Sequence, residues 1–219
     1  MSPADPALVA DRAKALALTP VSRETLERLD RFVALLLDWQ GRMNLIAPST
    51  IPTIWTRHIA DSLQLLDLAP DARIWIDLGS GAGFPGLVIA CALADTPGAM
   101  VHLVESTKKK AAFLSKAQQV TGAPAKIHPE RIETFVPTFA GKADIVTARA
   151  LAPLPALFAQ TAGLLGKTGA RALFPKGQGV DLELQEASKS WIVNAELVPS
   201  RTDPNARIVS LRELKPRNA

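Results

Sequence analysis

An acidic residue followed by three alternating glycines is the pattern in this chain with the clearest chemical meaning. The acid is Asp77, and the glycines are Gly79, Gly81 and Gly83. Glycines allow positive φ and let a ligand approach the backbone closely. A second acid, Glu105, ends the next apolar run of the chain, where a carboxylate can accept hydrogen bonds from ribose hydroxyls. The pattern therefore predicts a site for a nucleoside cofactor.

Two cofactors fit this glycine loop. Gly81, Gly83 and Gly86 satisfy the G-x-G-x-x-G spacing of dinucleotide-binding proteins. Alternating glycines after an acid at the end of a strand are typical of S-adenosylmethionine binding, and Asp77 is such an acid. A P-loop is excluded because no Gly-Lys-Ser/Thr follows. The position of Asp77 favours S-adenosylmethionine, and a purely structural turn is the remaining alternative.

Basic residues end or follow other predicted strands on the same rim. Arg149 ends the fourth predicted strand, where an arginine would grip a carboxylate, a phosphate or a guanine edge. Lys108, Lys109 and Lys110 open a predicted helix, although positive charge at a helix start opposes the helix dipole. Lys176 ends a further strand. These side chains predict a phosphate-binding rim, and a solvated surface is the alternative for the lysines.

The sequence offers no obvious nucleophile or general base. His58, Asp61 and Ser62 lie on one predicted helix, whereas the members of a hydrolytic relay come from separate elements. Cys91 lies in an apolar helix and is expected in the core. Residues 148–151 lack the Asn/Asp-Pro-Pro-aromatic motif that commonly serves exocyclic amines. Guanine N7 already has an in-plane lone pair and no proton, so methyl transfer to it needs alignment and no base. The residues permit that acceptor.

Strands alternate with helices in the second part of the chain. The order predicts an α/β fold with a mostly parallel seven-stranded sheet, helices on both faces and an antiparallel edge. We expect a helical N-terminal extension over residues 1–70 and one compact cofactor-binding domain over residues 71–219. The expected strands are 73–78, 101–104, 125–127, 143–147, 170–174, 193–198 and 207–211, and the expected helices are 22–41, 50–68, 85–94, 108–120, 154–165 and 181–190.

Composition excludes several classes of protein. Hydrophobic residues make up 47% of the 219 residues, so the chain can bury a core. The apolar runs are shorter than the roughly 20 residues that cross a membrane, and no signal peptide pattern begins the chain. One cysteine excludes a thiolate metal cluster. We therefore expect a cytoplasmic protein without a bound metal. The net charge is +4, and residues 105–131 hold six basic against two acidic residues.

The chain resembles a bacterial family, the 16S ribosomal RNA guanine-N7 methyltransferases known as RsmG or GidB. The resemblance extends over essentially the whole chain, and it is most specific in Arg57-His58-Ile59-Ala60-Asp61-Ser62 together with the glycine loop and its Phe84-Pro85-Gly86. It implies a class I methyltransferase (Rossmann-like) fold, S-adenosylmethionine as methyl donor, and a guanine in the decoding-region loop of 16S rRNA as acceptor. The implied partner is 16S rRNA or the small ribosomal subunit, and we expect a monomer.

The resemblance also assigns roles to individual residues. Gly79 and Phe84 would line the cofactor site, with Glu105 at the ribose, and Ile132 and Glu133 would flank the adenine. Arg149 would complete the pocket and position the reactants. The residues that match family positions on the RNA side, or the adjacent basic run, are Asn44, Arg57, His58, Asp61, Lys108, Lys109 and Lys176. Many members have Asn-Leu-Thr where this chain has Asn44-Leu45-Ile46, and an aspartate where it has Glu105.

Two other functions remain as alternatives on the residues alone. A nicotinamide-dependent oxidoreductase would use Gly81, Gly83 and Gly86. A non-catalytic RNA- or ribosome-binding protein would keep the basic surface with a degenerate cofactor pocket. Response to S-adenosylhomocysteine against NAD separates the first from a methyltransferase.

Overall fold

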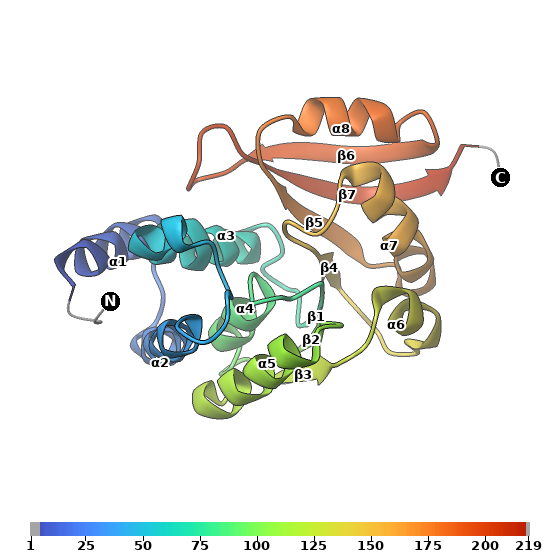
Figure 1. Cartoon of the computed structure of the whole chain (residues 1–219). Helices are drawn as coiled ribbons and strands as arrows, with labels where there is room; N and C mark the ends of the chain where they lie inside the picture. Colours follow the sequence, from blue (N-terminus) through green and yellow to red (C-terminus); the bar gives the residue numbers. More distant parts are fainter. Residues whose placement is uncertain (1–4, 218–219) are drawn as a thin grey trace.

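A seven-stranded sheet forms the centre of the molecule in the computed structural model, which describes residues 5–217 (Figure 1). The strand order is β3-β2-β1-β4-β5-β7-β6, and only the pairings of β7 with its two neighbours are antiparallel. The predicted mostly parallel sheet with an antiparallel edge is therefore confirmed. The strands are β1 (Ile74–Leu78), β2 (Met100–Val104), β3 (Ala125–His128), β4 (Ile145–Thr147), β5 (Arg171–Lys176), β6 (Trp191–Pro199) and β7 (Arg207–Pro216).

Helices cover both faces of this sheet, and each face has its own hydrophobic cluster. Within β1, Trp75 joins the cluster with α1 to α5, whereas Ile76 and Leu78 join the cluster with α6 to α8. Such burial on both sides explains why the parallel strands read as continuous apolar runs. The helices are α1 (Pro6–Leu18), α2 (Arg23–Gln40), α3 (Asp61–Asp67), α4 (Gly86–Ala92), α5 (Lys108–Thr121), α6 (Ile132–Thr138), α7 (Leu154–Thr168) and α8 (Val180–Ala187).

The single helix expected over residues 50–68 is wrong. The chain forms a 3₁₀ helix (Pro48–Thr53), a π-helical turn (Trp55–Ala60) and then α3. Pro52 has no amide hydrogen and disfavours a regular α-helix around it. The buried carboxylate of Asp11 also accepts hydrogen bonds from the backbone amides of Trp55 and Thr56, at 2.8 and 3.2 Å. This long-range contact fixes the irregular segment that carries Arg57, His58 and Asp61.

Two helices were not expected as separate elements, namely α1 and α6. Pro137 lies within the short α6, so the local pattern there favours a loop more than a helix. The helix after the glycine loop begins at Gly86, and Pro85 immediately precedes it.

The N-terminal helices pack directly beneath the glycine loop. Phe32 of α2 lies 5.4 Å from the ring of Phe84 and 6.3 Å from that of Phe113. A methyl group added at Gly83 would come within 3.2 Å of Phe32 and 3.0 Å of Leu87. Helix α2 therefore packs against the glycine loop, and the absence of a side chain at Gly83 permits this close contact.

Candidate active site

The glycine loop is fixed to the end of the neighbouring strand by backbone hydrogen bonds. The amides of Gly79 and Ser80 both donate to the carbonyl oxygen of Val104, at 2.9 and 3.0 Å. Gly79, Gly81 and Gly83 have φ of 70°, 54° and 93°, a region that side chains rarely adopt. The loop therefore needs glycine for its shape as well as for ligand access.

Five of the predicted cofactor residues line one cavity of about 300 Å³ at this loop: Gly79, Gly81, Glu105, Ile132 and Glu133. The size lies at the lower end of small-molecule sites. The Glu105 carboxylate is 7% exposed, and it accepts hydrogen bonds from the amides of Gly81 at 2.9 Å and Thr107 at 2.6 Å. Lys110, one of the three lysines predicted to form a phosphate-binding rim, also lines this cavity. Ser106, Leu151 and Gln160 line it too and were not found from the sequence.

Asp77 lies beneath the loop rather than on the cavity wall. Its carboxylate is fully buried and accepts a hydrogen bond from the amide of Gly86 at 3.1 Å. The other oxygen, Oδ1, has no hydrogen-bond partner in the described part of the chain. Burial in the core raises the pKa of Asp77 to about 7. A buried acceptor without a partner is costly and calls for a donor or a cation.

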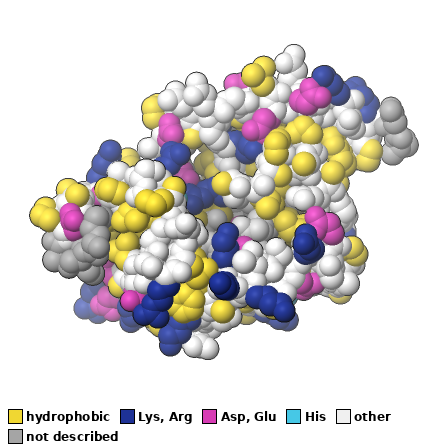
Figure 2. Space-filling model, viewed as in Figure 1, with side chains coloured by type: hydrophobic (Ala, Val, Ile, Leu, Met, Phe, Trp, Pro, Cys, Tyr) yellow, Lys and Arg dark blue, Asp and Glu magenta, His cyan; other side chains and the backbone are white. Residues whose placement is uncertain are grey.

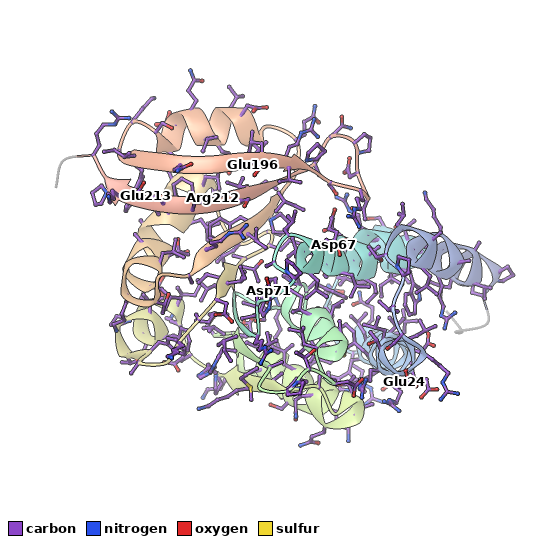
Figure 3. The ribbon with its side chains drawn as sticks, turned by 180° about the vertical axis from the view of Figure 1, so that it is seen from behind. Glu24, Asp67, Asp71, Glu196, Arg212 and Glu213 are labelled. Carbon is purple, nitrogen blue, oxygen red and sulfur yellow. The ribbon has the colours of Figure 1, made fainter. Side chains whose placement is uncertain are left out.

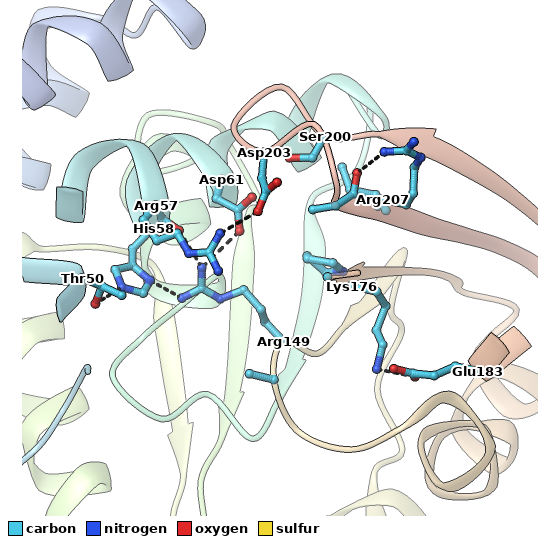
Figure 4. A pocket seen from close by; sticks show the side chains of 15 residues that line it. Thr50, Arg57, His58, Asp61, Arg149, Lys176, Glu183, Ser200, Asp203 and Arg207 are labelled. Atoms are coloured by element: carbon cyan, nitrogen blue, oxygen red, sulfur yellow. Dashed lines mark hydrogen bonds and ion pairs between the residues drawn. The ribbon is translucent and has the colours of Figure 1, made fainter. Parts of the chain in front are cut away.

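Arg149 is the centre of a largely buried polar cluster, with 17% of its own side chain exposed (Figure 4). Its guanidinium donates to Nδ1 of His58 at 2.6 Å and to the carboxylate of Asp61 at 3.1 Å. The guanidinium carbon lies 5.2 Å from the ring centre of Phe84, and the His58 ring stacks on the same phenyl ring at 4.8 Å. Phe84 therefore packs against Arg149 and His58. It does not line the glycine-loop cavity, contrary to the prediction.

The protonation of this cluster follows from its burial. Desolvation, reinforced by the charges of Arg149 and Arg57, lowers the pKa of His58 to about 3. Burial lowers the pKa of Arg149 also, although Asp61 opposes that shift. His58 is therefore neutral near pH 7, so Nδ1 accepts from Arg149 and Nε2 donates to the Thr50 hydroxyl at 3.0 Å. Neither ring nitrogen is left to act as a base.

A second cavity, of about 330 Å³, lies against this cluster and is lined by Arg57, His58, Asp61, Arg149 and Lys176. The structure therefore brings together five residues that the sequence singled out. Ala150 lines both cavities, and its φ of 51° is the only positive value of a non-glycine residue in the described chain. The two cavities thus meet at the residue that follows Arg149.

Acidic partners hold the cations of the second cavity in place. Lys176 pairs with Glu183 at 2.6 Å, and Arg57 pairs with Asp203 at 2.9 Å. Sequence reasoning missed Glu183, Asp203 and Arg207, which also line this cavity. Asp203 lies 146 residues after Arg57, so no local pattern links the pair.

The remaining predicted residues lie outside both cavities. Asn44 is exposed in the loop after α2, and Lys108 is exposed in the first turn of α5. Lys109 lines a separate groove with Trp39 and Arg42. Residues 5–217 contain no group of three acidic, histidine or cysteine side chains arranged around a metal ion. Within the same residues, no helix is both long enough and apolar enough to span a membrane.

The sequence of the chain decides its family. Residues 25–207 match the family model GidB, described as rRNA small subunit methyltransferase G. The chain belongs to the GidB family. It is 60% identical to the ribosomal RNA small subunit methyltransferase G of a Bradyrhizobium species (strain BTAi1), over 93% of this chain and 91% of that protein. The identity to the protein of the same name from Rhodopseudomonas palustris (strain BisB18) is 55%, over 99% and 92%.

Solved structures of more distant proteins share the fold of this GidB member. An O-methyltransferase from Bacillus cereus, in complex with SAH, superposes with a TM-score of 0.59 at 11% identity, over 93% of this chain and 97% of that chain. A ribosomal protein L11 methylase from Lactobacillus delbrueckii gives 0.53 at 14% identity, over 71% and 77%. The predicted class I methyltransferase fold is therefore confirmed. Because the chain belongs to the GidB family, the oxidoreductase alternative is rejected.

Proposed function

We propose that this GidB protein transfers a methyl group from S-adenosylmethionine to N7 of one guanine in the decoding-region loop of 16S rRNA. The observation that carries the proposal is the junction of two cavities at Ala150. One cavity has the glycine loop and an acid for a nucleoside, and the other has a buried arginine. The chain matches 91–92% of the length of two relatives that are named ribosomal RNA small subunit methyltransferase G.

The residues around the glycine loop fit this cofactor. A methyl group at Gly81 would meet only the carbonyl oxygen of Gly79 within 4 Å, so no side chain blocks the space before the loop. Glu105 supplies carboxylate oxygens for ribose hydroxyls, and Ile132 supplies an apolar wall for a base. The buried carboxyl of Asp77 accepts a hydrogen bond from the amide of Gly86 and so supports the loop from beneath. S-adenosylmethionine supplies an electrophilic methyl group on its sulfonium.

The residues of the second cavity bind and orient the acceptor in this proposal. Arg149 is fixed by His58, Asp61 and the Phe84 ring, so its guanidinium is preorganised and loses little freedom when a guanine binds. Arg57, whose side chain is 56% exposed beside Asp203, and Lys176, which pairs with Glu183, supply positive charge in this cavity for the RNA backbone. No proton has to leave N7, which matches a cavity where His58 is neutral and fully hydrogen-bonded.

Methyl transfer with labelled S-adenosylmethionine tests the proposal. The substrates are small-subunit rRNA from cells that lack this methylation, both as naked RNA and as assembled subunits. We expect label in one of them, and stabilisation of the protein by S-adenosylhomocysteine but not by NAD. Binding of S-adenosylhomocysteine without label in either substrate would contradict catalysis and favour the non-catalytic RNA-binding alternative. We also infer action in the cytoplasm, where the ribosomal substrate is made, and a monomeric enzyme.

A further inference from the structure

A groove beside the cofactor cavity combines an aromatic side chain with unshielded positive charge. It has a volume of about 280 Å³ and is lined by Trp39, Arg42, Met43, Lys109 and Ala112. Trp39 is half-buried at the end of α2, and Lys109 is exposed in the first turn of α5. Figure 2 shows a hydrophobic patch over this region with Lys and Arg side chains on both sides. Neither of the two cavities of the proposed active site includes this groove.

Contacts with the core of the protein hold the Trp39 side chain in place. Its ring lies 5.5 Å from that of the fully buried Phe113, so the packing of the core fixes its position. The carbonyl oxygen of Trp39 also accepts hydrogen bonds from the backbone amides of Arg42 and Met43, at 2.9 and 3.0 Å. An aromatic ring that is already immobilised loses little entropy when a ligand stacks on it.

The charges of the groove are available to an anionic ligand. Lys109 belongs to none of the ion pairs within residues 5–217. Arg42 lies 3.8 Å from Asp38, but its side chain is 76% exposed, so water screens that pair strongly. Lys108 and Lys110 flank Lys109, and the first turn of α5 contains no acidic residue. The groove therefore presents an apolar floor between positive charges, which complements a base flanked by phosphates.

The groove lies next to both cavities along the chain. Met43 lines the groove and Thr50 lines the Arg149 cavity, so one short segment connects the two sites. On the other side, Lys109 lines the groove and Lys110 lines the cofactor cavity. An RNA strand that has one nucleotide in the Arg149 cavity and follows this segment would reach the groove.

We propose that the groove binds a second, unstacked nucleotide of the RNA substrate, whose base stacks on Trp39 and whose phosphates contact Arg42 and Lys109. This inference rests on the proposed function, because the ligand is the same RNA. A surface lined this way suits single-stranded RNA, where splayed bases stack on aromatic rings between basic side chains. The groove would then help select an RNA loop without reading the target guanine itself.

Steady-state methyl transfer to naked small-subunit rRNA tests the inference. We compare Trp39→Ala, Trp39→Leu and Trp39→Phe. Loss of one stacked base weakens RNA binding about 5- to 150-fold, so KM for RNA is expected to rise in this range for the Ala and Leu variants, with a smaller effect on kcat. Trp39→Phe is expected to stay close to the wild type. Leucine keeps apolar packing on Phe113, and binding of S-adenosylhomocysteine checks that each variant is folded.

Substitution of the two basic residues of the groove tests the same inference independently. Arg42→Ala and Lys109→Ala are each expected to reduce the slope of log affinity against log salt by about 0.7, the value for one phosphate on single-stranded nucleic acid. Lys142→Ala is the matched control, because Lys142 is an exposed cation before the amino end of β4 that lines neither the groove nor either cavity. Its slope is expected to equal that of the wild type.

The outcomes distinguish failure of the RNA-binding groove from failure of the proposed methyltransferase function. An unchanged KM for naked RNA in Trp39→Leu, while the wild type methylates that RNA, would overturn the groove and leave the methyltransferase intact. A defect seen only with assembled subunits would overturn it in favour of a protein contact. If the wild type methylates no RNA, the proposed function fails, and direct binding of the same RNA by the Trp39 variants still tests the groove.

Discussion

Arg149 lines the second cavity and directly precedes Ala150, where the two cavities meet, and we expect it to serve the chemical step more than cofactor binding. We predict that Arg149→Ala lowers kcat for methyl transfer about 10²- to 10³-fold, as for other preorganised charges at a reacting centre. Arg149→Lys keeps the charge but loses the planar fork that contacts His58 and Asp61 together, so it should recover little activity. Arg212→Ala, on the face shown in Figure 3, is the control. Near-normal turnover of Arg149→Ala would remove this residue from the site.

The buried carboxyl of Asp77 has a consequence for stability. Its folded pKa of about 7 lies above the ordinary value of 3.8, so the folded state holds a proton that the unfolded state has lost between these values. The wild type therefore loses stability as the pH rises from about 4 to 7 through this group. We predict that Asp77→Asn gains stability relative to the wild type over that window, by on the order of 1–4 kcal/mol. Urea unfolding at several pH values measures the difference, and parallel stability curves for the two proteins would contradict the assignment.

At the scale of elements, the contact between β1 and α4 depends on a glycine that is not in a strained conformation. A methyl group at Gly86 would come within 2.4 Å of Leu103 and 2.6 Å of Asp77. We predict that Gly86→Ala destabilises the protein by about 1–3 kcal/mol through overpacking. Gly166 is exposed within α7 with no atom within 4 Å of the added methyl, so Gly166→Ala should stabilise by about 0.5–1 kcal/mol. Equal melting temperatures of the two variants would contradict the packing argument.

The elements that the sequence predicts correctly are those with a local signal. Parallel strands are apolar throughout, and the glycine loop carries its own conformational requirement, so both could be located without a structure. The irregular segment over residues 48–60 could not, because the carboxylate of Asp11 that fixes it lies 44 residues before Trp55. Asp203 was missed for the same reason, since it pairs with Arg57, 146 residues earlier, whereas Glu183 lies near its partner Lys176 in sequence but carries no motif that marks it.

The molecule as a whole has an uneven distribution of charge. The hollow in the middle of the face in Figure 2 is bordered by Lys and Arg side chains. The opposite view in Figure 3 presents the exposed acids Asp67, Asp71, Glu196 and Glu213. Although the net charge is only +4, Arg57, Arg149 and Lys176 line the second cavity, and Arg42 and Lys109 line the Trp39 groove. RNA is therefore expected to approach from the face in Figure 2.

This arrangement predicts a strong effect of salt on RNA affinity. If four or five cations contact phosphates, the slope of log affinity against log salt is about −3 to −4.5, at roughly 0.7–0.9 per contact. Fluorescence anisotropy with a labelled fragment of small-subunit rRNA between low and physiological salt gives this slope. An affinity that does not change with salt would contradict the basic face as the RNA-binding surface.

The position of the methyl group on the RNA tests the central claim most directly. Small-subunit rRNA methylated in vitro by this protein is treated with borohydride and aniline, which cleave the chain at N7-methylguanine. We expect a single cleavage site in the decoding-region loop, which is absent when S-adenosylmethionine is omitted. Labelled RNA that resists cleavage would contradict N7 as the acceptor, and cleavage at many guanines would contradict a selective RNA site.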